Sequence, residues 1–201
     1  MNQTRRKMLK LAGLALAAGA VPGQVLAAPA PAPRKISLEE LARGVDAVEG
    51  LARNWSAVTA RGKSGEVNAM TAGWGGLGNA WKKPVCTVYI GPHYTRKLID
   101  ETGRFSVAYF DGAHKRELTW LGTHTGAEEQ DKIAKAGLHV ADLGGFPAIA
   151  EGRYACVCRV LLRHELSARD FVDASIPRDI YGTRGWSVLY CAEIESAWKL
   201  F

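Results

Sequence analysis

The amino-acid sequence predicts a mainly β protein with a few helices, folded as a β-barrel. Short apolar stretches of strand length recur along the chain, and turn-forming residues separate them. Only a few segments carry the caps and the spacing typical of helices. The 201 residues, 47% of them apolar, are enough for one well-buried domain and too few for two of ordinary size. We therefore expect a single barrel domain.

Residues 1–27 are expected to be a twin-arginine signal peptide. The pair Arg5-Arg6 precedes a mildly apolar segment at 11–21, and the small-residue site Val25-Leu26-Ala27 follows. A retained membrane anchor is the alternative, but the apolar run is about half of the ~20 residues that a membrane span needs. We therefore expect cleavage after residue 27, a periplasmic or other extracytoplasmic location, and membrane contact only through this signal.

Without this leader the chain is nearly neutral. The leader holds four of the 26 basic side chains and none of the 20 acidic ones, so 22 basic and 20 acidic side chains remain. No run of Lys and Arg with interleaved aromatic residues follows, so nucleic acid is not an expected partner. Residues 28–36 are expected to form an extended Ala/Pro-rich tail, and residues 37–201 the folded domain.

The first part of the domain is expected to contain one helix and three strands. Ser37 and Glu40 have the spacing of a capping box, which predicts a short helix over one end of the barrel. Residues 54–60 and 66–72 flank a glycine-containing turn and are expected to pair as a β-hairpin. The apolar run 85–90 is the next predicted strand.

Helices and strands alternate through the middle of the chain. Residues 94–103 are expected to form a helix that ends at a glycine, and residues 105–110 a strand. A short helix is expected over 115–121. Thr125 and Glu128 then repeat the capping-box spacing, which predicts that another helix starts at Thr125 and ends at Gly137.

The last third of the chain is expected to add two strands and two irregular segments. Residues 144–147 are expected to form a loop, and residues 153–165 are long enough for a strand that crosses the whole barrel. Acids, prolines and glycines are mixed over 167–185, which predicts a surface excursion. Residues 187–198 are the expected final strand.

The stretch 68–84 is the one around which we expect the chain to be organised. Four glycines lie within the six residues 73–78, and so many glycines are not expected in regular structure. They allow the backbone to come close to something flat or charged. Because Trp74 and Trp81 flank them, an apolar ring system is the expected guest.

Six motifs follow one another along the chain after the leader. They are Asn68–Gly75, Pro92–Thr95, Leu121–Gly126 with Asp131-Lys132, Cys156–Arg159, Phe171–Asp173 and Tyr190–Ile194. With these motifs in this order, the chain resembles the flavin reductase-like, FMN-binding proteins of the flavoredoxin type. This resemblance implies an FMN-binding split β-barrel and a homodimer.

A first group of cofactor-binding residues follows from the resemblance. Met70, Thr71, Ala72, Gly73 and Trp74 match the strand end that contacts the flavin in the family. Their main-chain donors, and the hydroxyl of Thr71, are expected at the pyrimidine edge of FMN, where negative charge grows on reduction.

A second group is expected at the phosphate. His93, Tyr94 and Thr95 stand at a predicted helix start, where free N–H groups and the helix dipole favour an anion. Relatives commonly carry Arg-Pro-x-Arg-Tyr-Thr here, whereas this chain has neither arginine. Arg96 or Lys97 is the expected substitute.

A third group lies at the next predicted helix start. Thr123, His124 and Thr125 offer hydroxyls and amides to a phosphate or ribityl chain, with Lys132 about two turns further on. A lone surface histidine is more often solvated than a ligand, so the assignment of His124 depends on the family motif.

The four cysteines are expected to be core residues. Cys86, Cys156, Cys158 and Cys191 each lie in an apolar predicted strand and show no Cys-x-x-Cys spacing. Cys156 and Cys158 share a strand face, although a disulfide between them would need distorted geometry. The five histidines are dispersed, so no metal site is predicted.

Two functions remain open from the sequence. The first is an exported FMN-dependent oxidoreductase that takes hydride from NAD(P)H and passes electrons to a small molecule or a redox protein. Hydride goes directly to the flavin ring, so no catalytic side chain is assigned. The second is a non-enzymatic electron carrier or flavin-binding module with a redox-protein partner. The scarcity of nicotinamides outside the cytoplasm favours the second.

Overall fold

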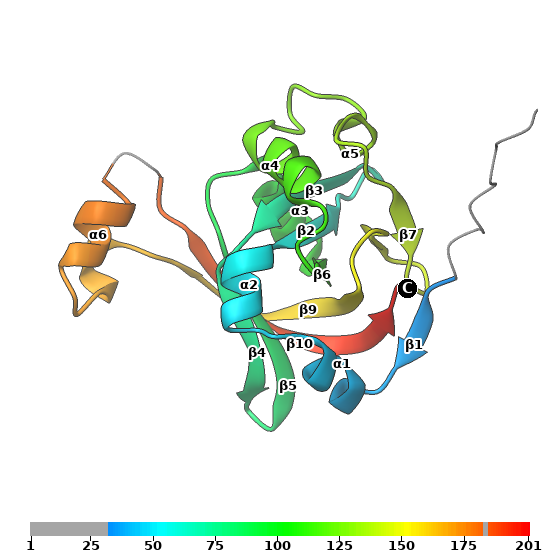
Figure 1. Ribbon diagram of the computed structural model, residues 1–201. Coiled ribbons are helices and arrows are strands. Elements are labelled where there is room, and N and C mark those ends of the chain that lie inside the picture. The colour runs from blue at the N-terminus through cyan, green and yellow to red at the C-terminus, as the bar shows by residue number, and fades with distance from the viewer. Residues whose placement is uncertain (1–31, 183–184) are drawn as a thin grey trace, which may run out of the picture.

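The computed structural model describes residues 32–182 and 185–201 (Figure 1). The predicted signal peptide lies outside the described residues. The strands are β1 (Arg34–Ile36), β2 (Ser56–Arg61), β3 (Val67–Ala72), β4 (Gly75–Ala80), β5 (Lys83–Ile90), β6 (Arg104–Tyr109), β7 (Val140–Asp142), β8 (Pro147–Ile149), β9 (Tyr154–Glu165) and β10 (Val188–Lys199). The helices are α1 (Leu38–Gly44), α2 (Glu49–Asn54), α3 (Tyr94–Thr102), α4 (Lys115–Thr123), α5 (Lys132–Lys135) and α6 (Ser175–Ile180), with a 3-10 turn at Ala168–Asp170.

One antiparallel sheet forms the barrel. Its strands follow the order β3-β2-β6-β9-β10-β5-β4, and β1 pairs separately with β10. The long strands β9 and β10 pair along their whole lengths in the middle of this order. The end strands β3 and β4 do not pair with each other, so the barrel is split. The predicted mainly β fold is confirmed.

Two apolar clusters hold the sheet in shape. The first fills the barrel interior and includes the fully buried Phe105 and Tyr190. The second packs α4 and the β7–β8 hairpin against the outer face of β2, β3 and β6, with Leu118 and Ile149 fully buried. Each such side chain contributes about 1.5–3 kcal/mol on burial. The second cluster therefore fixes α4 against β3.

Several predicted elements are confirmed, together with the local signals that predicted them. The Ser37 hydroxyl accepts a hydrogen bond from the Glu40 N–H at 3.0 Å, which caps α1. Helix α3 ends at Gly103, which has a left-handed φ of 67°. The hairpin β2–β3 and the long strand β9 occupy the expected segments.

The expectation that the glycine-rich stretch lacks regular structure is wrong. Gly75–Ala80 is strand β4, and it pairs with β5 from Gly75 opposite Val88 to Ala80 opposite Lys83. The main-chain hydrogen bonds to β5 hold this edge strand, so it does not depend on side-chain packing. Trp81 and Lys82 form the tight turn of this hairpin with positive φ values of 51° and 61°.

The helix predicted from Thr125 to Gly137 is also wrong. Helix α4 continues to Thr123, whose hydroxyl donates to the Thr119 carbonyl at 3.0 Å. The Thr125 carbonyl then accepts N–H groups in a turn, and only the short α5 follows. Asp131 precedes α5 with a left-handed φ of 56°, which prevents one continuous helix.

Three smaller differences concern irregular segments. Residues 34–36, expected in the extended tail, form β1 and pair with residues 197–199 of β10. Pro147, expected in a loop, begins the short strand β8. The surface excursion is confirmed: it carries α6 and extends away from the barrel as an arm between β9 and β10 (Figure 1, orange). Among the described residues, no helix is long and apolar enough to cross a membrane.

Gly75 gives a test of how β4 is held. Its φ is 147°, and an added Cβ would lie 2.1 Å from the Thr87 carbonyl oxygen of β5. Gly75→Ala should therefore lower the free energy of unfolding by about 2 kcal/mol or more in urea denaturation. Gly78→Ala is the matched control, because no atom lies within 4 Å of its added Cβ. Equal stability of the two variants would contradict the pairing described for Gly75.

Candidate functional site

A cavity of about 550 Å³ lies where β3 ends, between the barrel and the arm. It is formed by the end of β3, the end of β5 with the residues before α3, Gly122 of α4, and the arm. Its lining residues are Met70, Thr71, Ala72, Gly73, Trp74, Tyr89, Gly91, Pro92, His93, Gly122, Ile180, Tyr181, Gly185 and Ser187.

The open edge of β3 supplies main-chain groups to this cavity. β3 pairs only with β2, so every second N–H and C=O along it points away from the sheet. The Ala69 carbonyl is one of these, because it accepts the Lys132 ammonium at 2.9 Å from outside the β2–β3 hairpin. The period of two places the main chain of Thr71 on the same open edge. Its N–H is therefore available to a ligand.

Aromatic side chains form one wall of the cavity. Trp74 is 46% exposed and meets Tyr181 of the arm edge to face, with ring centroids 6.4 Å apart. Tyr181 in turn stacks on Trp186 at 4.8 Å, and Phe171 stacks on Trp186 at 6.2 Å. This arrangement leaves part of the Trp74 ring free for a flat apolar guest.

The start of α3 forms a positively charged end of the cavity. His93 is the N-cap residue of α3, and no side chain caps the helix there. Burial lowers the pKa of His93, and the nearby charges of Lys132 and Arg96 lower it further. Because both cations act on His93, the free N–H groups of the helix start lie in a field that favours an anion.

A second cavity, of about 640 Å³, continues along β3 on the other side of this helix start. Asn68, Tyr94, Gly126 and Lys132 are among its lining residues. Lys132 is only 5% exposed, and burial lowers its pKa to about 8. The two cavities therefore follow the same strand edge, with the start of α3 between them.

The flavin reductase like domain model matches residues 48–198 of this sequence. The chain belongs to this family. The matched segment runs from the start of α2 almost to the end of β10, so it includes every strand of the split barrel except β1 and all residues that line the 550 Å³ cavity. No protein with a curated function matches the sequence.

Solved structures of the flavin reductase-like type share the fold. One is an FMN-binding domain of a flavin reductases-like enzyme from Shewanella baltica, with 19% identity, a TM-score of 0.61, and coverage of 85% of this chain and 78% of that one. Another is flavoredoxin from Methanosarcina acetivorans, with 24% identity, a TM-score of 0.54, and coverage of 73% and 68%. The styrene monooxygenase flavin reductase of Pseudomonas putida has 13% identity, a TM-score of 0.53, and coverage of 72% and 78%. The expected split-barrel fold is thus confirmed.

The flavin reductase-like fold brings the first predicted group together. Met70, Thr71, Ala72, Gly73 and Trp74 all line the 550 Å³ cavity. The hydroxyl of Thr71 does not point to a ligand, because it donates to the Leu118 carbonyl of α4 at 2.5 Å. The main chain of Thr71, and not its side chain, is the donor that the site offers.

The second predicted group is divided. His93 lines the same cavity, whereas Tyr94 lines the neighbouring one. Thr95 is fully buried, and its hydroxyl accepts a hydrogen bond from the Asn68 side-chain amide at 2.8 Å. Thr95 therefore connects α3 to β3. This contact does not use the hydrogen of its hydroxyl, and its role at an anion stays a prediction.

The third predicted group lies at the end of a helix and not at the start of one. Thr123 is the last residue of α4, and His124 stacks on Trp120 at 3.8 Å with Nδ1 2.9 Å from the Trp120 carbonyl. Carbonyls and not N–H groups are free at this end. Thr123, His124 and Thr125 do not line the 550 Å³ cavity, although the preceding Gly122 does. Their contact with a cofactor stays a prediction.

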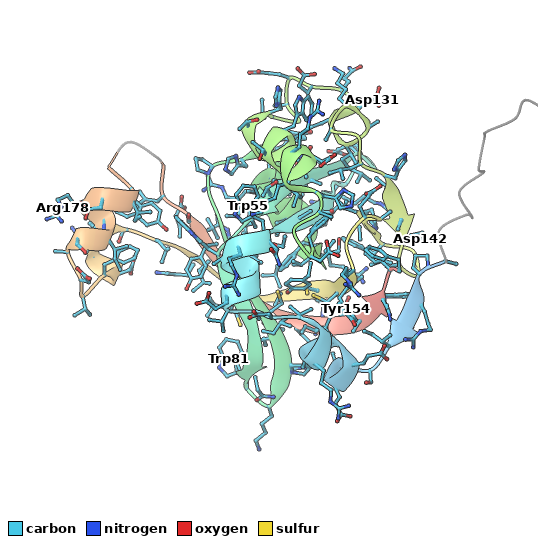
Figure 2. The ribbon with its side chains drawn as sticks, viewed as in Figure 1. Trp55, Trp81, Asp131, Asp142, Tyr154 and Arg178 are labelled. Atoms are coloured by element: carbon cyan, nitrogen blue, oxygen red, sulfur yellow. The ribbon has the colours of Figure 1, made fainter. Side chains whose placement is uncertain are left out.

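The two tryptophans also have different positions. Trp74 lines the cavity, whereas Trp81 is in the turn of the β4–β5 hairpin (Figure 2). The six residues of β4 separate them, which is about 20 Å of extended chain. Only Trp74 can contact a guest in the cavity.

Sequence reasoning missed the contribution of the arm. Ile180 and Tyr181 line the cavity, and the Trp186 carbonyl accepts a hydrogen bond from Arg96 at 3.4 Å. The available signal was the presence of Phe171, Tyr181 and Trp186 in a stretch that also holds acids, prolines and glycines. Of the two expected substitutes for the missing arginines, Arg96 lies near His93 and pairs with Glu165 at 3.8 Å, and Lys97 pairs with Glu101 at 3.7 Å.

Lys132 gives the site a measurable pH dependence. Its pKa is about 8 in the folded protein, against about 10.4 for an unfolded lysine. Between these values the unfolded chain binds more protons, so the free energy of unfolding should rise with pH. Relative to Lys132→Met, the wild type should therefore gain stability from pH 8 to pH 10 in urea denaturation. The exposed Lys63 provides the control: Lys63→Met should keep the wild-type slope. Parallel slopes for wild type and Lys132→Met would contradict the low pKa.

Proposed function

We propose that this protein is an exported FMN-binding oxidoreductase that moves electrons from NAD(P)H through the flavin to an acceptor. The observation that carries the proposal is the 550 Å³ cavity, in which a free strand edge, an exposed tryptophan face and an uncapped helix start meet. Membership of the flavin reductase like domain family supports it, and so do FMN-binding proteins and flavin reductases among the structural neighbours.

The residues present fit the three parts of FMN. The pyrimidine edge requires hydrogen-bond donors, which the main chain at Thr71 offers on the open side of β3. The ring system requires apolar contact, which Trp74 and Tyr181 offer. The phosphate requires N–H groups and positive charge. The start of α3 offers the N–H groups of Tyr94 and Thr95, since that of His93 donates to the Gly91 carbonyl at 2.7 Å, and Arg96 and Lys132 supply the charge.

The flavin, when bound, would supply the hydride and electron chemistry. The role of the protein is to bind and orient it. Main-chain donors of a rigid strand edge need no reorganisation as negative charge develops near them. Tyr181 and Ile180 of the arm would limit water at the ring face. No side chain in the cavity has to donate or accept a proton for direct hydride transfer, which agrees with a site made of backbone and aromatic groups.

A comparison of the two exposed tryptophans tests flavin binding. Trp74→Ala should weaken FMN binding by about tenfold, because an aromatic contact is worth about 0.5–1.5 kcal/mol beyond its buried area. Trp81→Ala should bind FMN like the wild type, because Trp81 lies at the other end of the β4–β5 hairpin. Titration of apoprotein with FMN, followed by flavin fluorescence, measures both. If Trp81→Ala lost as much affinity as Trp74→Ala, the cavity would be the wrong site.

Anaerobic mixing of the FMN-loaded protein with NADH or NADPH tests the direction of electron flow. Bleaching of the flavin absorbance on the time scale of turnover is the expected result. The rival function is a non-enzymatic electron carrier whose partner is a redox protein; the exposed apolar side chains of the arm favour such a partner. Flavin that dithionite bleaches and neither nicotinamide reduces would support the carrier.

We also propose that the protein is a homodimer joined through the arm. The arm extends away from the barrel (Figure 1) and exposes Val172, Ile176 and Ile180, of which Val172 is 105% exposed. Apolar side chains on a projecting segment are typical of protein contacts. Because Ile180 and Tyr181 also line the cavity, a partner on the arm would lie close to the proposed flavin.

Light scattering with a charged substitution tests the dimer. Val172→Asp should shift the protein towards the monomer at micromolar concentration, because a carboxylate would be buried at the interface. Val48→Asp is the control, because Val48 is also exposed but lies on the barrel next to α2. A monomeric wild type, or dissociation of both variants alike, would contradict the proposed interface.

Export remains part of the proposal. It is supported by the Arg5-Arg6 pair and the small-residue site before residue 28, and by the ability of the twin-arginine route to carry folded proteins with bound cofactors. N-terminal sequencing of the protein from its native compartment checks it. A mature chain that starts at residue 28 is the expected result, and an intact start at Met1 would contradict cleavage.

A further inference from the structure

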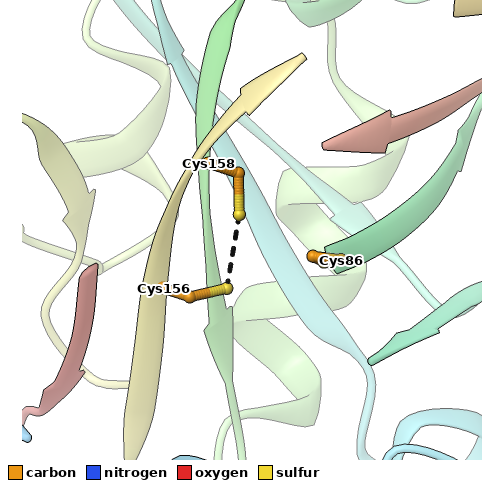
Figure 3. Close-up of side chains that lie close together, drawn as sticks. All are labelled: Cys86, Cys156 and Cys158. Atoms are coloured by element: carbon orange, nitrogen blue, oxygen red, sulfur yellow. Dashed lines mark hydrogen bonds between the residues drawn. The ribbon is translucent and has the colours of Figure 1, made fainter. Parts of the chain in front are cut away.

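Three cysteines that lie far apart in the sequence meet inside the barrel. Cys86 comes from β5, and Cys156 and Cys158 come from β9 (Figure 3). Their sulfur atoms all lie within 4.8 Å of one another, and those of Cys156 and Cys158 are 3.6 Å apart. β10 lies between β5 and β9 in the sheet, so the sulfurs meet because the sheet curves and all three side chains point into the barrel.

We infer that Cys86, Cys156 and Cys158 form a binding site for a single soft, thiophilic metal ion, with Cu(I) as the best match. Thiolate ligands select Cu(I), Zn(II) and iron–sulfur clusters among biological metals. With metal–sulfur bonds of about 2.3 Å, three sulfurs around a trigonal ion lie about 4 Å apart. The sulfurs are therefore already close to the separation that one ion would impose.

The ligand set distinguishes Cu(I) from the other two candidates. Structural zinc takes four protein ligands, and the group found among the described residues contains three. An iron–sulfur cluster needs four ligands and more room, whereas all three cysteines are 0% exposed in a packed core. A three-sulfur site without water is suited to a monovalent ion of low coordination number.

The charge balance also favours a monovalent ion. One thiolate and one Cu⁺ together carry no net charge, which a low-dielectric interior tolerates. When Cu⁺ binds, it takes the place of the Cys86 proton, which passes to solvent, and no electron is transferred.

Tyr109 connects this cluster to the outside. Its hydroxyl lies 3.5 Å from the Cys86 sulfur, within reach to donate a hydrogen bond to a thiolate there. Tyr109 also lines a separate cavity of about 300 Å³ on the barrel end near α2. Asp46, Asp111 and Arg153 line the same cavity, where Arg153 pairs with Asp111 at 3.6 Å.

Anaerobic titration with Cu(I), in the presence of a competing Cu(I) chelator, tests the site in the purified full chain. The wild type should retain one Cu(I) per chain in native mass spectrometry. Cys86→Ser and Cys156→Ser should each lose at least about a hundredfold in affinity, because removing only a hydrogen-bond partner of a metal ligand already costs 10- to 100-fold. Cys191→Ser is the matched control, because Cys191 is buried but lies outside the cluster.

A measurement on the wild type avoids variants that do not fold. X-ray absorption at the copper edge should find three sulfur neighbours and no nitrogen or oxygen neighbour. The inference is overturned if the chelator removes all copper, if Cys191→Ser loses as much affinity as the cluster variants, or if Zn(II) and not Cu(I) is retained. It is also overturned if thiol counting in denaturant finds two free thiols in the untreated protein, since Cys156 and Cys158 would then form a disulfide.

Discussion

The site depends on the fact that the sheet does not close. β3 and β4 are both edge strands, and neither pairs with the other. A free strand edge carries unpaired N–H and C=O groups, which a soluble protein has to cover or use. Along β3, some of these groups are covered and others face the cavity. Lys132 covers the edge at Ala69, whereas the end of β3 and the residues that follow it, from Met70 to Trp74, line the cavity.

Burial of the Lys132 ammonium at the edge of β3 costs free energy, and this clarifies the role of the residue. A buried ammonium is unfavourable in an apolar environment, and the pKa of about 8 reflects that. The hydrogen bond to the Ala69 carbonyl satisfies an edge group that would otherwise be buried without a partner. The same charge acts on His93 at the start of α3. One side chain therefore completes the strand edge and contributes to the positive end of the cavity.

Most elements could be predicted from the sequence because their signals act within one turn or one strand. The cap at Ser37 and the stop at Gly103 depend on neighbours three or four residues away. β4 could not be predicted in this way: glycine lowers local strand propensity, but pairing with β5 is decided by a neighbouring strand. The capping-box spacing at Thr125 was misleading because α4 continues to Thr123 and Asp131 breaks the helix that would follow.

The candidate site, too, could be predicted only where its signal lies within one segment of the chain. The cavity position of Met70 to Trp74 could be predicted because a motif and a strand end coincide in one segment. The hydrogen bonds of the Thr71 and Thr95 hydroxyls could not be predicted, because their partners, Leu118 and Asn68, are distant in the sequence. The cysteine cluster is the clearest case. No spacing along the chain indicates that Cys86 meets Cys156, because the contact arises from sheet order and curvature.

The arm links the two ends of the proposed flavin site. Arg96 lies one turn into α3, near the expected phosphate position, and it donates to the Trp186 carbonyl at the base of the arm. Trp186 stacks on Tyr181, and Tyr181 meets Trp74 at the expected ring position. A change in the position of the arm would therefore displace both the aromatic wall and the carbonyl that accepts the Arg96 hydrogen bond. In the proposed site, the contacts to the ring and to the phosphate thus meet at the arm.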